Sequence, residues 1–149
     1  MKLEEEIAQK QFKNEYQKAS INIIYTNNWL SNKAAGLFKE FDITQQQYNV
    51  LRILRGQYPK PCPVNTIKER MLDKMCDASR IVDRLKIKGL LIRTKNDLDR
   101  RAVDIIISEK GLSLLEALDQ HVSDLDTSIR NLTEEEVVTL NTLLDKIRE

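Results

Sequence analysis

Apolar residues return at every third or fourth position along the first part of the chain. This period matches the 3.6 residues per turn of an α-helix, so one side of the segment is apolar. The pattern predicts a single long helix from about Glu5 to Phe41. The recurring residues are Phe12, Tyr16, Ala19, Ile23, Leu30, Ala34 and Leu37, with one seven-residue step.

A second helix is predicted from Thr44 to about Gly56. Thr44 and Gln47 match a capping box, in which two side chains satisfy backbone amides at the start of a helix. Three prolines then fall within the segment 59–63. Because proline lacks an amide hydrogen and restricts the residue before it, this segment is expected to be an extended connector.

Two further helices are predicted after the connector. The first runs from Val64 to Met71, and the second from about Lys74 to Lys88. Asp73 is the expected N-cap of the second helix, and Gly89 is expected to end it. One face of this helix is apolar and is expected to pack in the core; its residues are Ala78, Ile81, Val82 and Leu85.

A β-hairpin and two helices complete the predicted fold. The strands are Leu90–Arg93 and Ala102–Ile107, joined by a polar tip. Ser108 is expected to cap a long helix, and Thr133 with Glu136 matches a second capping box before the last one.

This order of elements predicts a mostly α fold with a small β-hairpin wing, which is a winged helix-turn-helix layout. Residues 43–111 are expected to form this DNA-binding domain. Residues 1–42 and 112–149 are expected to form a helical dimerisation region, because their helices carry more apolar residues than a small domain needs.

Charge is unevenly distributed along the chain, although the net charge is only +1. Residues 52–101 contain 14 Lys or Arg and six Asp or Glu, whereas the remainder contains 10 basic and 17 acidic residues. A basic centre between acidic ends is the electrostatic footprint of a protein that binds a polyanion. The alternative is chance clustering of charges on a solvated face.

Several classes of protein lack support in the sequence. Cys62 and Cys76 are too few for a disulfide scaffold, and neither lies in a zinc motif. No apolar run approaches the roughly 18 residues of a membrane span, and the acidic start does not resemble a signal peptide, so we expect a cytoplasmic protein. His121 is the only histidine and is expected at the surface or at a subunit interface. No catalytic, metal-binding or cofactor-binding constellation is present, so we expect a protein that is not an enzyme.

The second face of the predicted helix Lys74–Lys88 is small and polar at its N-terminal end. The face carries Cys76, Ser79, Arg80, Asp83 and Ile87. A helix that enters the major groove needs slim polar residues at this end, and arginine pairs with guanine. The alternative is an ordinary amphipathic surface helix.

The predicted hairpin concentrates positive charge at its tip. Arg93, Lys95, Arg100 and Arg101 surround the tip, and Asp99 lies where it could hold the Arg101 guanidinium. A narrow minor groove attracts an inserted arginine. The alternative is a solvated turn with surface ion pairs.

Two motifs resemble those of the MarR transcription factors. Residues 99–111 resemble the wing signature of that family, an Asp-x-Arg followed by an apolar strand and Leu-Thr-x-x-Gly, with Ile107 and Ser108 in place of the Leu and Thr. Residues 78–90 resemble its recognition helix. Met75 and Asp77 depart from the basic or hydroxyl residues that many members have there.

This resemblance implies a homodimeric regulator, expected to be a repressor, that binds double-stranded operator DNA. Each subunit would place a recognition helix in the major groove and a wing in the adjacent minor groove. The residues expected to contact DNA or position the contacts are Lys74, Cys76, Asp77, Ser79, Arg80, Arg84, Lys95, Asp99, Arg100 and Arg101.

A small aromatic ligand that releases the DNA is also implied by the resemblance. Its expected pocket is lined by Tyr25, Trp29, Phe38 and Tyr48, although plain core packing is the alternative. Cys76, expected in the first turn of the recognition helix, could have a thiol pKa lowered by the helix dipole and respond to oxidants. The rival function is a ligand-binding or protein-interaction module of the same fold that binds no DNA.

Overall fold

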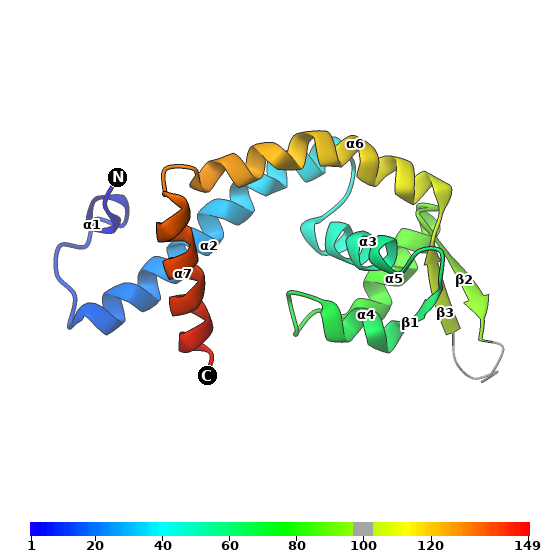
Figure 1. Cartoon of the computed structure of the whole chain (residues 1–149), viewed down its shortest axis with the longest axis horizontal. Helices are drawn as coiled ribbons and strands as arrows, with labels where there is room; N and C mark the ends of the chain where they lie inside the picture. Colours follow the sequence, from blue (N-terminus) through cyan, green and yellow to red (C-terminus); the bar gives the residue numbers. More distant parts are fainter. Residues whose placement is uncertain (97–102) are drawn as a thin grey trace.

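The computed structural model describes residues 1–96 and 103–149, and the side chains of all of these except 122–127. Figure 1 shows a long helical arm joined to a lobe that contains the sheet. The fold is mostly α-helical with a small sheet, as predicted. The elements are α1 (Leu3–Glu6), α2 (Glu15–Glu40), α3 (Gln45–Gln57), β1 (Cys62–Pro63), α4 (Val64–Arg70), α5 (Ala78–Ile87), β2 (Leu91–Lys95), β3 (Val103–Ile107), α6 (Glu109–Asp126), the 3-10 turn η1 (Thr127–Ile129) and α7 (Glu134–Ile147).

The prediction of one helix from Glu5 to Phe41 is wrong at its N-terminal end. Helix α1 ends at Glu6, and Ala8 has a positive φ of 52° that interrupts the helix. Helix α2 begins after Asn14, whose side chain accepts a hydrogen bond from the Gln17 amide at 2.9 Å. The apolar period alone could not reveal this break, because a local cap ends a helix without changing the spacing of apolar residues.

The predicted start of the recognition helix is also wrong, by about one turn. The N-cap of α5 is Asp77, which accepts from the Arg80 amide at 3.1 Å. Asp73 instead accepts from the Met75 amide at 3.0 Å and from the Gln46 side-chain amide at 3.0 Å. Both aspartates suit an N-cap, and the sequence analysis expected Asp73. The predicted end is confirmed, since α5 ends at Ile87 with Lys88 as its C-cap, and Gly89 has a φ of 71°.

The sheet in the described chain has the strand order β1–β3–β2, with antiparallel pairs. The register places Leu91 opposite Ile107 and Arg93 opposite Ile105. Cys62 of β1 also pairs with Ile105, so the end of the predicted extended connector forms the third strand.

The core lies in the lobe, between α3, α4, α5, the sheet and the first half of α6. Each large apolar side chain buried here stabilises the fold by about 1.5–3 kcal/mol. The most completely buried residues are Val50, Leu51, Leu54, Ile67, Met71, Val82, Leu85, Ile105, Leu115 and Leu118. The apolar face predicted for the recognition helix is therefore confirmed.

The joint between the sheet and α6 requires a glycine. A β-carbon on Gly111 would lie 2.3 Å from the Leu90 carbonyl oxygen and 2.7 Å from the Ile107 side chain. The Gly111 amide also donates to Ser108 Oγ at 3.1 Å, as expected of a cap at the start of α6. The backbone of α6 consequently passes close to Leu90, in the turn between α5 and β2.

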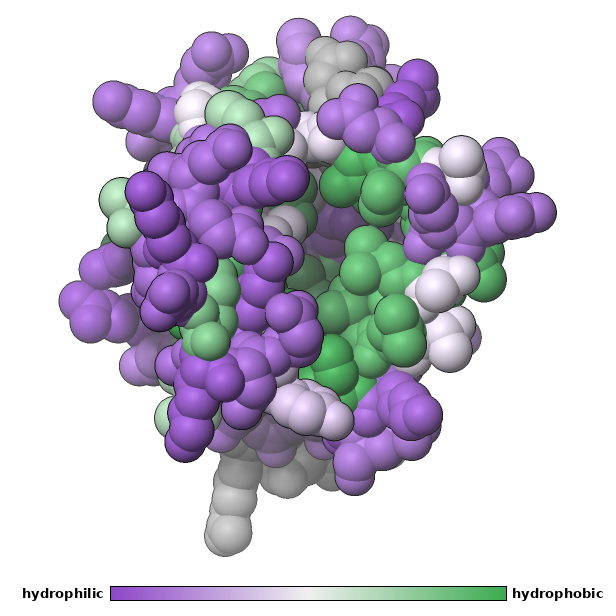
Figure 2. Space-filling view, turned by 90° about the vertical axis from the view of Figure 1, so that its left-hand side faces the viewer, coloured by the Kyte–Doolittle hydropathy of each residue, from purple (hydrophilic) through white to green (hydrophobic). Residues whose placement is uncertain are grey.

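The outer helices, which are α2, α6 and α7, leave many apolar side chains uncovered. Helix α7 has no buried residue, although it carries an apolar stripe. Figure 2 looks at the end of the molecule formed by the outer helices and shows apolar side chains gathered around a hollow. The exposed apolar residues of α2 and of the segment from η1 to α7 are Tyr16, Ile23, Ile24, Leu30, Ile129, Leu132, Val138, Leu140, Leu143 and Ile147.

Candidate nucleic-acid interface

Helix α5 is held by one face and exposes the other. Val82 and Leu85 are fully buried, and they anchor the helix on α3 and the sheet. Ser79 and Arg80 are exposed at its N-terminal end, as the sequence predicted. This end combines two polar side chains with the positive pole of a helix, which favours contact with an anion such as a phosphate.

Three carboxylates lie on or before α5, and each is engaged within the protein. Asp77 caps the helix, and Asp73 holds the preceding turn. Asp83 accepts a hydrogen bond from the Arg93 guanidinium of β2. A carboxylate with an internal donor repels a nearby phosphate less than a bare one does, because its charge is partly neutralised. These aspartates are therefore compatible with an anionic partner.

The turn before α5 contains two of the residues predicted to contact DNA. Lys74 donates to the Glu69 carbonyl oxygen, which ties its side chain to the end of α4. Cys76 is half-buried, and burial followed by the charge of Asp73 raises its thiol pKa. The expectation of a lowered thiol pKa is wrong, because Cys76 precedes the helix instead of lying in its first turn.

The described part of the wing ends in polar residues. Lys95 is exposed at the end of β2, and the Asn96 side-chain amide donates to the Asp104 carboxylate at 3.0 Å. The predicted residues Asp99, Arg100 and Arg101 lie outside the described residues.

The C-terminal end of α5 contacts both long helices. The Lys88 ammonium lies 3.0 Å from the Asp42 carboxylate, and the Lys110 ammonium donates to the Lys88 carbonyl oxygen at 2.9 Å. Ser108 Oγ donates to the Gly89 carbonyl oxygen at 2.7 Å. The end of α5 is thus fixed between the end of α2 and the start of α6.

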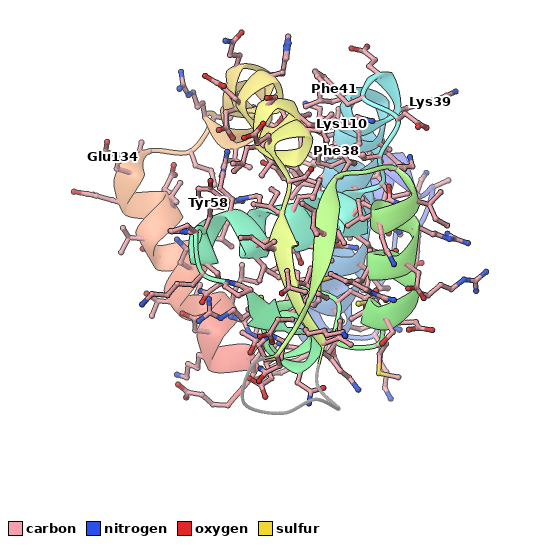
Figure 3. All side chains as sticks on the ribbon, turned by 90° about the vertical axis from the view of Figure 1, so that its right-hand side faces the viewer. Phe38, Lys39, Phe41, Tyr58, Lys110 and Glu134 are labelled. Atoms are coloured by element: carbon pink, nitrogen blue, oxygen red, sulfur yellow. The ribbon has the colours of Figure 1, made fainter. Side chains whose placement is uncertain are left out.

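A cleft of about 640 Å³ opens beside this joint. Figure 3 shows Phe38 and Lys39, at the end of α2, above α5. The cleft has an apolar floor and a basic rim, which suits a small amphipathic anion. Its lining residues are Ala35, Phe38, Lys39, Asp42, Ile43, Thr44, Gln45, Gln47, Arg84, Ile87 and Lys88.

The four aromatic residues predicted to form a pocket do not all come together. Phe38 and Tyr48 are in contact, with ring centroids 4.8 Å apart. Tyr25 instead donates to Glu6 of α1 at 2.6 Å, and Trp29 lies under the Lys33 ammonium at 4.0 Å. Of the four, Phe38 lines the cleft beside α5. The sequence analysis missed Lys39 and Lys88 there; the spacing of Arg84 and Lys88 on one side of α5 was the available signal.

Other kinds of site find no support in residues 1–96 and 103–149. No group of three or more His, Cys, Asp or Glu side chains there could hold a metal ion. The described helices include none with the length and apolar content needed to cross a bilayer.

Known proteins resemble this chain in sequence and in fold. The model of the MarR family matches residues 43–103. The multiple antibiotic resistance protein MarR of Salmonella typhimurium is 34% identical over 125 residues, which cover 81% of this chain and 78% of that protein. The regulator MhqR of Bacillus subtilis is 34% identical over 86 residues, and this match spans 57% of the chain and 59% of MhqR.

A crystal structure of a mutant MarR from E. coli complexed with operator DNA has the same fold. It superposes with a TM-score of 0.80 at 28% sequence identity, covering 93% of this chain and 99% of that one. Together with the Salmonella relative and the matched segment, this likeness shows that the chain belongs to the MarR family of winged-helix transcriptional regulators, which are DNA-binding proteins and not enzymes.

Proposed function

We propose that this protein is a cytoplasmic repressor that binds operator DNA as a homodimer. The observation that carries the proposal is the construction of α5. Val82 and Leu85 of its apolar face are fully buried, and its N-terminal turn presents Ser79 and Arg80 to solvent. The operator complex of the E. coli relative supports the same use of the fold here.

In this proposal α5 enters the major groove, and the wing enters the adjacent minor groove. Ser79 and Arg80 read base edges or bind phosphates, with Asp77 fixing the turn that carries them. Further phosphate contacts come from both sides of the helix and from the wing. The proposed contributors are Lys74, Cys76, Arg84, Lys95, Arg100 and Arg101, with Asp99 orienting Arg101.

The uncovered apolar side chains of the outer helices support a dimer. A monomer would leave this surface in water, and large contiguous apolar patches mark contacts between subunits. We assign dimerisation to residues 1–42 and 112–149 and DNA binding to residues 43–111. The two recognition helices are then held at a fixed separation, as two half-sites of an operator require.

Release of the DNA by a small aromatic acid is supported by the cleft beside α5. Phe38, Ile43 and Ile87 provide apolar contacts, and Lys39 with Arg84 provides positive charge. The cleft adjoins the end of α5, so a bound ligand changes contacts that fix the recognition helix.

The binding of duplex DNA tests the central proposal. If the dimer neutralises about eight phosphates, the log–log dependence of the binding constant on salt has a slope near −7. Arg80→Ala and Arg101→Ala should each weaken operator binding by about 1–3 kcal/mol. Lys13→Ala, which removes a charge far from the lobe, serves as the control. Fluorescence anisotropy over a salt series measures both quantities. A slope near zero with every duplex would support the rival module that binds no DNA.

The assembly state tests the proposed dimer. Leu140→Lys should convert a dimer to a monomer at micromolar concentration, because it places a charge within the apolar stripe of α7. Thr142→Lys adds the same charge on another face of the same helix and should leave the dimer intact. Light scattering coupled to size exclusion gives the mass. A monomeric wild type, or equal effects of the two lysines, would contradict the assignment.

Direct binding of benzoate tests the cleft. Benzoate, used as a minimal aromatic acid, should bind the wild type and lose about tenfold or more in affinity in Lys39→Gln, since a hydrogen bond to a charged group contributes about 1.5–3 kcal/mol. Lys33→Gln removes a lysine that stacks on Trp29 instead and is the matched control. Calorimetric titration measures the affinities. Equal losses in both variants, or no binding to the wild type, would exclude this site for aromatic acids.

A further inference from the structure

One ion pair joins the wing to the recognition helix. Arg93 of β2 donates through Nη2 to Oδ1 of Asp83, which lies on the outer part of α5. The strand register places Arg93 opposite the buried Ile105, so its side chain leaves the sheet on the face that packs against α5. Figure 3 shows β2 running beside α5 along this face.

The surroundings of Arg93 distinguish this pair from an ordinary surface contact. Its side chain is 32% exposed, and that of Asp83 is 56% exposed. The Nε atom of Arg93 is shielded from water and has no hydrogen-bond partner in the described part of the chain. The Nε end of the guanidinium is therefore held in the protein, while Nη2 reaches the half-exposed Asp83 carboxylate.

The position of Asp83 gives the pair a consequence for DNA binding. Asp83 stands between Arg80 and Arg84 along a helix proposed to face a duplex. A bare carboxylate there repels phosphates, and a free arginine there binds any phosphate whatever the base sequence. The ion pair removes both the repulsion by Asp83 and the non-specific binding by Arg93. It also couples α5, proposed to enter the major groove, to the wing, proposed to enter the minor groove.

We propose that Asp83 and Arg93 are a positioning pair that determines specificity: Asp83 holds Arg93 away from the DNA backbone and locks the wing to the recognition helix. This inference rests on the proposed DNA-binding function. It assigns Arg93 no contact with DNA, although Arg93 belongs to the basic hairpin.

The two halves of the pair then have different effects when removed. Asp83→Asn frees Arg93 to bind phosphates, so affinity for an unrelated duplex rises while the wing loses its fixed position. Arg93→Met keeps the alkyl part of the side chain and leaves Asp83 as a bare charge. Affinity then falls for every duplex, and the number of phosphates contacted stays the same.

The experiment compares two duplexes over a salt series. One duplex is selected from a random library by the wild-type protein, and the other has the same composition in shuffled order. The variants are Asp83→Asn, Arg93→Met and the double variant. Glu116→Gln, on the exposed side of α6 and outside both α5 and the wing, removes one negative charge and is matched in charge to Asp83→Asn.

The inference predicts a distinct signature for each variant. Asp83→Asn should bind the shuffled duplex about three- to tenfold more tightly, with a salt slope steeper by about 2 for the two freed arginines of a dimer. Its preference for the selected duplex should fall about tenfold, since each base contact discriminates by about that factor or more. Arg93→Met should lose preference with an unchanged slope.

Three results would overturn the inference. A slope shallower by about 2 in Arg93→Met would mean that Arg93 binds phosphates in the wild type. An unchanged preference in Asp83→Asn would mean that the pair does not position the wing, and an equal response of Glu116→Gln would make the effect one of net charge alone.

Thermal unfolding without DNA separates this inference from the function on which it rests. The proteins compared are the wild type, Asp83→Asn, Arg93→Met and the double variant. The two single variants should lower the melting temperature by more, in sum, than the double variant does. Additive shifts would mean that the pair is not formed and would overturn the inference even if the wild type binds DNA. A wild type that binds neither duplex would overturn the proposed function and this role together, whatever the melting temperatures are.

Discussion

The geometry of the lobe depends on the packing of the apolar face of α5. Val82 and Leu85 are buried against α3 and the sheet, so the helix has one orientation and its polar N-terminal turn is always exposed. Interiors are close-packed, and a helix held in this way cannot rotate without opening a cavity that costs several kcal/mol. The positions of the exposed side chains of α5 are therefore determined by the packing of the buried face of the same helix.

The two ends of α5 are fixed by different interactions. At the N-terminal end, Asp73 and Asp77 hold backbone amides of the turn and of the helix. At the C-terminal end, the Lys88 and Gly89 backbone carbonyls accept from Lys110 and Ser108 at the start of α6. The interactions at the N-terminal end fix the backbone that carries the exposed Ser79 and Arg80. The interactions at the C-terminal end connect the end of α5 to the start of α6.

Sequence pattern revealed the parts of this arrangement that follow from local chemistry. The capping boxes at Thr44 and Thr133 and the glycine after α5 predicted helix boundaries, because each satisfies backbone groups within four residues. The sequence pattern predicted the wrong start for two helices. For α5, Asp73 and Asp77 both suit an N-cap, and for α2 the start depends on the single N-cap Asn14. The cleft beside α5 was missed because Lys39 and Lys88 line it from distant parts of the chain, and tertiary packing, which no spacing in the sequence records, places them at the same cleft.

In the proposed dimer, two recognition helices held in this way would form one rigid unit that contacts both half-sites, and this is the central claim. Hydroxyl-radical footprinting on a duplex selected by the protein tests it most directly. The account predicts protected backbone in two half-sites about 10 base pairs apart, on one side of the duplex. Protection confined to a single half-site, or spread evenly around the duplex, would contradict it.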